Sequence, residues 1–123
     1  MYQKVEMIGH LGNDPQMRYT PDGTPVTSFS VAASKKWTGA DGVKHETTVW
    51  FRVAAWRKLA EVCNQFLKKG ALVFVSGEIA EPKPYQDKQG NWRASLEVTA
   101  DEVKFLSRKA EGETPAEAED IPF

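Results

Sequence analysis

The stretch RKLAEVCNQFLKKG, residues Arg57–Gly70, has a different hydrophobic period from the rest of the chain. Its apolar residues recur at helical spacing and form one face of an amphipathic helix, made of Leu59, Val62, Cys63, Phe66 and Leu67. Lys68 and Lys69 favour the negative end of a helix dipole, and Gly70 suits the left-handed position that follows a helix. The stretch therefore predicts one helix with a core-facing apolar side.

On both sides of this segment the sequence has the alternation of strands and the residues of turns. Turns are expected at Asn13–Pro15 and Pro21–Gly23, and a glycine-rich loop at Thr38–Lys44. Gly9 is expected to mark a bulge or a bend. The predicted strands are Lys4–Leu11, Pro25–Trp37, Thr47–Trp56, Leu72–Ala80 and Trp92–Ala100, with Val103–Leu106 either extending the last strand or beginning another.

The order of three strands, one helix and two strands predicts the fold class. It is typical of a five-stranded Greek-key barrel of the OB type, which carries one helix at this place. The alternative is a five-stranded α+β sheet with the helix on one face. A single helix and long hairpin loops favour the barrel. We therefore predict an all-β fold with one helix, in the form of a five-stranded OB-fold barrel.

The C-terminal segment differs in composition from the predicted barrel. Residues 1–109 hold all 16 Lys and Arg and have a net charge of +4, whereas residues 110–123 hold five acids, no Lys or Arg, and a net charge of −5. The stretch RKAEGETPAEAED cannot bury enough apolar surface to offset its ordering entropy. We predict a domain at residues 1–106 and a disordered acidic tail at 107–123. The tail ends in an apolar tip that comprises Asp120, Ile121, Pro122 and Phe123.

Length and composition exclude several classes of protein. A chain of 123 residues is expected to form one domain. No apolar run approaches the roughly 18 to 20 residues of a membrane span, and the N-terminus lacks the apolar core of a signal peptide. The single cysteine, Cys63, excludes an internal disulfide and fits a reducing compartment. His10 and His45 lack metal-ligand spacing, so we expect neither a metal nor a cofactor.

The stretch VWFRVAAW, residues Val49–Trp56, carries the most functional information. Successive side chains of a strand point to opposite faces, and one face here is apolar throughout. The opposite face presents Trp50, Arg52 and Trp56. One interpretation is that both indoles pack under a neighbouring element or at a subunit interface. The other is a platform on which bases stack while Arg52 meets phosphate.

Further aromatic residues lie beside cations, in predicted loops or at the strand ends that border them. Trp37 follows Lys35 and Lys36, and Tyr85 lies in PKPYQDKQGNWR together with Lys83, Lys88, Trp92 and Arg93. Interleaved cations and rings are typical of single-strand binders, because charge follows the backbone and rings take the bases. Duplex readers place a helix or a ribbon in the major groove, and the one predicted helix faces the core instead.

Enzyme motifs are missing from the sequence. There is no glycine-rich phosphate loop, no Gly-x-Ser-x-Gly and no paired-carboxylate motif. Glu78 and Glu81 fit a solvated strand end, and Cys63 falls on the apolar helix face as a small core residue. We therefore expect a binding protein and not an enzyme.

Several stretches in order resemble the bacterial single-stranded DNA-binding protein family. They are GHLGNDPQMRYTPDGTPVTSFSVAAS, the pair Trp37 and Trp50 followed by FRV, KLAEVCNQFLKKG, VFVSGEI and the terminal DIPF. The resemblance covers residues 1–106 and returns at the tip. It implies an OB fold, usually assembled as a homotetramer, that wraps single-stranded DNA without sequence preference during replication, recombination and repair. It also implies a bacterial cytoplasmic, nucleoid-associated location and a C-terminal tip that binds replication and repair proteins.

The resemblance assigns roles residue by residue. It carries base stacking onto Trp37, Trp50 and Trp56, the last standing where many members have Phe. Tyr85 stands where many have Trp, and Trp92 is added by its neighbourhood. Phosphate contacts are implied for Arg52, Lys58, Lys68 and Lys83, and by neighbourhood for Lys35, Lys36, Lys88 and Arg93. Arg18 matches a family segment in which a structural role and a DNA contact are both open.

Two alternatives to single-stranded DNA binding remain open at the level of sequence. The same platform would serve an RNA-binding or primosome-type OB module. The aromatic residues would otherwise lie at the interfaces of a structural oligomerisation domain or an enzyme accessory domain.

Overall fold

The computed structural model describes residues 1–106, and the predicted tail and its tip lie outside the described residues. It contains eight strands and one helix in this part of the chain. They are β1 (Val5–Leu11), β2 (Gln16–Tyr19), β3 (Pro25–Thr38), β4 (Lys44–Trp56), α1 (Lys58–Phe66), β5 (Leu72–Ile79), β6 (Pro84–Gln86), β7 (Trp92–Ala94) and β8 (Leu96–Phe105). The predicted class, all-β with one helix, is confirmed.

Five of the strands close into a barrel. The sheet runs β1-β5-β8-β4-β3, and β1 then pairs with β3 through His10 and Leu11. All these pairs are antiparallel except β4 with β8, which is parallel. The predicted OB-type barrel is confirmed, and the open α+β sheet is wrong. β2 adds a short strand to the outer edge of β3.

Several element bounds differ from the sequence prediction. β2 fills the interval between the two predicted turns, because its four residues pair in register with β3. β3 and β4 extend into the expected Thr38–Lys44 loop, so only residues 39–43 turn. Trp92 does not begin the last barrel strand. It lies in β7, which pairs only with β6, and β8 then runs from Leu96 to Phe105 past a register shift opposite Ser76 and Gly77.

Two glycines allow barrel strands to approach each other closely. Gly9 pairs regularly with Val73, so of the predicted bulge or bend the bulge is wrong. A Cβ atom at Gly9 would lie 2.2 Å from the Ala32 carbonyl oxygen, and one at Gly77 would lie 2.1 Å from the Thr99 carbonyl oxygen. Both distances are too short for any side chain. These positions fix how near β1 comes to β3 and how near β5 comes to β8.

Helix α1 packs against the barrel after a sharp turn at Arg57, whose φ is 60°. The buried Thr27 hydroxyl of β3 donates to the Ala60 carbonyl at 2.7 Å. Cys63 is fully buried in the core, as predicted, and burial raises the pKa of its thiol to about 12. The thiol is therefore protonated at neutral pH and is neither a nucleophile nor a metal ligand.

The end of α1 departs from the prediction. The helix stops at Phe66, and Leu67 is already extended, so Gly70 is not the residue that follows the helix. Gly70 instead turns the chain into β5 with a φ of +91°. Phe66 does not join the core. Its side chain is 53% exposed and contacts the ring of Phe105 at 6.2 Å between centroids.

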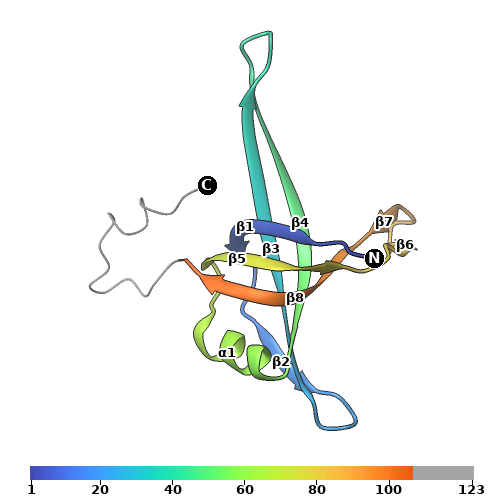
Figure 1. Cartoon of the computed structure of the whole chain (residues 1–123). Helices are drawn as coiled ribbons and strands as arrows, with labels where there is room; N and C mark the ends of the chain where they lie inside the picture. Colours follow the sequence, from blue (N-terminus) through green and yellow to red (C-terminus); the bar gives the residue numbers. More distant parts are fainter. Residues whose placement is uncertain (107–123) are drawn as a thin grey trace.

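Two hairpins project from the closed barrel (Figure 1). The first is the arm formed by the distal parts of β3 and β4, which extends well beyond the other strands at the top of the view. The second is the small β6–β7 hairpin, inserted between β5 and β8. The core within the barrel is made mainly of Val, Phe, Leu and Met side chains from β1, β3, β4, β5 and β8.

Candidate nucleic-acid interface

The outward face of β4 presents the rings that the sequence placed there. Phe51, Val53 and Ala55 point into the barrel, whereas Trp50, Arg52 and Trp56 are exposed. Across the ladder, Trp50 pairs with Ala32 and Arg52 with Ser30. Directly paired residues lie on the same face of a sheet, so small side chains form the floor beside the large ones. The large side chains of Trp50 and Arg52 on β4 thus stand beside the small side chains of Ala32 and Ser30 on β3.

A groove of about 550 Å³ lies next to these β4 side chains. It brings together predicted residues from separate parts of the sequence: Trp50 and Arg52 of β4, and Tyr85, Trp92 and Arg93 of the β6–β7 hairpin. Ser30, Thr48, Ser95 and Leu96 also contribute to its walls. Its volume and its mixed apolar and cationic lining suit an unpaired nucleotide, with a base against the rings and a phosphate against the guanidinium groups.

Trp50 lies against a glycine from a distant segment of the chain. A Cβ atom at Gly12 would lie 2.4 Å from a carbon of the Trp50 indole. The ring therefore lies directly against the backbone at Gly12, and one of its faces remains open because the side chain is 55% exposed. Gly12 helps to set the ring orientation before any ligand arrives.

Trp37 and Lys35 lie on the other face of the β3–β4 arm. Trp37 pairs with His45 and Lys35 with Thr47, and both positions continue the alternation of the core-facing residues Val31 and Ala33. The arm has left the barrel here, so this face is exposed and forms a groove of about 450 Å³. Its lining residues are Ala33, Lys35, Trp37, Thr47 and Val49. Lys36 is on the opposite face, in register with Glu46.

The Trp37 ring is stacked on His45. The ring centroids are 5.2 Å apart and the planes differ by 23°. Both residues line a hollow near the tip of the arm together with Lys36, Thr38, Lys44 and Glu46. The imidazole holds the indole against one side and leaves its other side to solvent.

Trp56 lies at the far end of β4, beside the β2–β3 turn. It forms a cross-strand row with Val26 of β3 and Arg18 of β2, because Val26 pairs with both of them. Trp56 and Arg57 also border a hollow with Thr20, Asp22 and Thr24. Arg18 therefore shares a face with Trp56. A ligand contact of Arg18 stays a prediction.

The remaining predicted cations are spread around the molecule. Lys58 is the first residue of α1, Lys68 follows its end, Lys83 precedes β6, and Lys88 lies in the β6–β7 turn. All four are exposed. Within residues 1–106, none of them lines the groove that holds Trp50. Their phosphate contacts stay predictions.

Comparison with known proteins identifies the family. The model of the Single-strand binding protein family matches residues 2–106. The chain belongs to this family. It is 44% identical over 108 residues to the single-stranded DNA-binding protein of Neisseria meningitidis, a match that covers 88% of this chain and 62% of that protein. It is 40% identical over 124 residues to the single-stranded DNA-binding protein of Caldanaerobacter subterraneus, covering 98% of this chain and 81% of that protein. The resemblance seen in the sequence is thereby confirmed.

A solved structure supports the fold. The complex described as "Plasmodium falciparum SSB complex with ssDNA" matches with a TM-score of 0.73 at 20% identity, covering 87% of this chain and 97% of that chain. At this identity the match shows the OB fold and not the contacts of individual residues. The chain spans about three fifths of the length of the Neisseria relatives that it matches.

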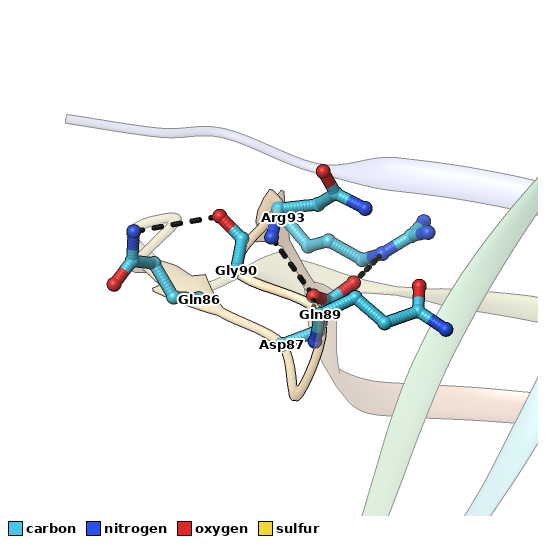
Figure 2. Close-up of polar contacts among 6 residues, drawn as sticks. Gln86, Asp87, Gln89, Gly90 and Arg93 are labelled. Carbon is cyan, nitrogen blue, oxygen red and sulfur yellow. Dashed lines mark hydrogen bonds and ion pairs between the residues drawn. The ribbon is translucent and has the colours of Figure 1, made fainter.

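Sequence reasoning missed one residue that shapes this member of the single-strand binding family. Asp87 in the β6–β7 turn accepts a hydrogen bond from Arg93 Nε at 2.8 Å, and bonds from the Gln89 and Asn91 backbone N–H groups at 2.9 Å each (Figure 2). These bonds, with Arg93 first, hold the pKa of the Asp87 carboxyl below its usual range. The signal was present in the spacing of Asp87 and Gly90, which is typical of a side-chain-stabilised turn.

Within residues 1–106, no three His, Cys, Asp or Glu side chains are grouped so that they could hold a metal ion. The nine-residue α1 is the one helix there, and it lacks the length and apolar character of a membrane span.

Proposed function

We propose that this chain is a sequence-independent single-stranded DNA-binding protein without catalytic activity. It coats and protects exposed strands in replication, recombination and repair, in the cytoplasm and on the nucleoid of a bacterium. Bacterial relatives named as single-stranded DNA-binding proteins support the ligand class and the setting. The groove that joins Trp50, Arg52, Tyr85, Trp92 and Arg93 supports the mechanism.

One observation carries the proposal: five large aromatic side chains are open to solvent beside cations. Trp37, Trp50, Trp56, Tyr85 and Trp92 are between 40% and 69% exposed. Packing within residues 1–106 therefore does not hide them, which argues against burial under a neighbouring element. The alternative of a subunit interface is tested by titration with oligo-dT. Each base stacked on such a ring contributes about 1–3 kcal/mol regardless of its identity. Arg52 and its neighbours would follow the phosphates.

The test is a fluorescence titration of the full chain with oligo-dT. Binding should quench tryptophan emission and weaken steeply with salt, by about 0.7 in log K per unit of log salt for each phosphate neutralised. Arg52→Gln should lower that slope by about one such increment. Unquenched emission with no complex at low salt would reject the proposal.

RNA is the competing ligand for the same groove. A matched titration with oligo-U and oligo-dT of equal length separates the two, because a site selective for RNA contacts the 2′-hydroxyl. We expect tighter binding of the DNA oligomer. Equal or tighter binding of the RNA would assign the groove to an RNA-binding module.

We also propose that the chain assembles with itself, as a homotetramer. Within residues 1–106, β1 pairs with β3 only through His10 and Leu11, so the edge of Val5–Gly9 facing away from β5 has no strand partner. Such an edge is a template for pairing with a second copy. The half-buried Ile8, Leu72 and Phe74 add apolar surface on the outside of the same strands. Mass measurement in solution tests this, and a monomer at micromolar concentration would exclude it.

The C-terminal tip is proposed to recruit replication and repair proteins. Its residues Asp120, Ile121, Pro122 and Phe123 offer two apolar anchors, acidic groups and a terminal carboxylate that a basic-rimmed cleft would capture. Deletion of residues 107–123 should abolish partner binding and leave the oligo-dT complex formed. Loss of both activities together would show that the tail is not a separate module.

A further inference from the structure

The β6–β7 hairpin presents Tyr85, Trp92 and Arg93 to the groove on very little secondary structure. Each of its strands has three residues, and within the described chain they pair only with each other. Pro84 also lacks a backbone donor. An isolated two-stranded hairpin is marginal in water. The placement of Tyr85, Trp92 and Arg93 therefore depends on contacts beyond the strand ladder.

Asp87 supplies those contacts. Its Oδ1 accepts from the backbone N–H groups of Gln89 and Asn91, and its Oδ2 accepts from Arg93 Nε (Figure 2). One carboxylate thus joins the turn to the second strand. Its backbone adds bonds to Asn91 and Gly90 at 2.9 and 3.0 Å. Both oxygens of the side chain are engaged, and each holds a different part of the hairpin.

The register transmits this contact to the groove. Tyr85 pairs directly with Arg93, so the two side chains lie on the same face of the hairpin. The bond to Asp87 fixes the Arg93 side chain and thereby restricts where the neighbouring Tyr85 ring can lie. The bond uses only the Nε donor of the guanidinium, and within residues 1–106 its Nη groups have no bonded partner. They remain available to a phosphate.

We propose that Asp87 is a positioning residue for nucleic-acid binding, acting through Arg93 to hold the Tyr85 and Arg93 face of the hairpin over the groove. The inference rests on the proposed function. A positioning role predicts that removing the Asp87 carboxylate weakens DNA binding, whereas charge repulsion alone predicts that its removal strengthens binding. An acid near a polyanion repels it, so an Asp without a positioning role should weaken binding, and its removal should tighten binding.

The test uses Asp87→Asn in the full chain, titrated with oligo-dT. The asparagine carbonyl can still accept from the Gln89 and Asn91 N–H groups, but its amide group cannot accept from Arg93. The turn is therefore retained and the Arg93 contact is lost. We expect affinity to fall about fivefold, as part of one stacking contact is lost. Asp101→Asn is the matched control, because Asp101 pairs with Lys4 at 3.3 Å outside the groove and carries the same charge.

A double variant measures whether Asp87 acts on the affinity for oligo-dT through Arg93. In the double variant Asp87→Asn with Arg93→Gln, the loss should be no larger than that of Arg93→Gln alone, since the contact is already gone and only the repulsive charge of Asp87 is removed. Tighter binding by Asp87→Asn, or unchanged binding, would overturn the proposal, as would an additive double variant. Failure of the wild-type chain to bind oligo-dT would instead refute the proposed function.

Discussion

Trp50 and the pair Tyr85 and Trp92 line one groove but are held in different ways. Trp50 lies in a 13-residue strand that pairs along its length with β3 and, in its second half, with β8, and its ring is against Gly12. Tyr85 and Trp92 lie on three-residue strands whose turn depends on Asp87. One wall of the groove is built into the barrel and the other is kept in place by polar contacts. Preorganised groups lose less entropy on binding, so the barrel wall should contribute more affinity.

The largest expected effect comes from removing the barrel rings. Trp50→Ala with Trp56→Ala should weaken oligo-dT binding by a few kcal/mol, at about 1–3 kcal/mol for each stacked base. Tyr85→Ala with Trp92→Ala should lower the affinity for oligo-dT clearly less. Binding of DNA also restricts the motion of these two rings, and the lost entropy reduces what they contribute. Titration at one salt concentration compares the two double variants. An equal or larger loss for the hairpin pair would contradict the comparison.

A smaller effect on oligo-dT affinity is expected when Gly12, which lies against Trp50, is replaced and the Trp50 ring is kept. At Gly12, the Cβ of an alanine would meet the indole at 2.4 Å, so Gly12→Ala must displace the ring. Affinity should fall by less than in Trp50→Ala, about 1 kcal/mol. In a Trp50→Ala background the same change should have no further effect, since nothing is left to displace. A loss that persists there would mean that Gly12 acts on the fold and not on the ring.

The face of β4 could be predicted from the sequence because one physical rule controls it. Strict alternation in VWFRVAAW separates the core residues from Trp50, Arg52 and Trp56, and the barrel obeys it. The same rule also predicts the face of Trp37, which lies an even number of residues from Phe29, Val31 and Ala33 on the same strand. The distribution of the predicted rings over two faces of the arm was therefore accessible from the sequence.

Other features depended on contacts that periodicity does not contain. The three-residue strands β6 and β7 are too short to show alternation, and their pairing rests on the bonds of Asp87. Phe66 has the helical spacing of a core residue, yet α1 ends at that position, beyond the cover of the barrel. The position of Gly12 under Trp50 joins two segments that are distant in sequence. Tertiary packing decides such cases.

Trp37 offers an intermediate case, because its ring is held by one neighbour. His45→Ala removes the stacked imidazole and should weaken oligo-dT binding by less than 1 kcal/mol, or about threefold, since the indole remains but is less ordered. His45→Phe keeps a stacking partner and should restore the affinity. The emission of Trp37 in a variant that lacks the other tryptophans reports the change directly. Equal affinities for wild type and His45→Ala would assign His45 no part in positioning.

The smallest effect is expected when the pH falls below about 4, and it should change only the wall of the groove formed by Tyr85 and Trp92. Bonds from Arg93, Asn91 and Gln89 lower the pKa of Asp87, so its carboxylate stays charged below the ordinary Asp value of about 3.9. A lowered folded-state pKa means that the contribution of these bonds is fully present above the unfolded value and is lost as pH falls through the folded one. The Trp92 indole N–H resonance of the DNA-free chain should therefore stay fixed from pH 7 to about pH 4 and move only below that. The Trp50 resonance should not share this transition while the barrel is folded, and Asp87→Asn should lack it. A Trp92 transition that Asp87→Asn retains would show that a different group holds this wall of the groove.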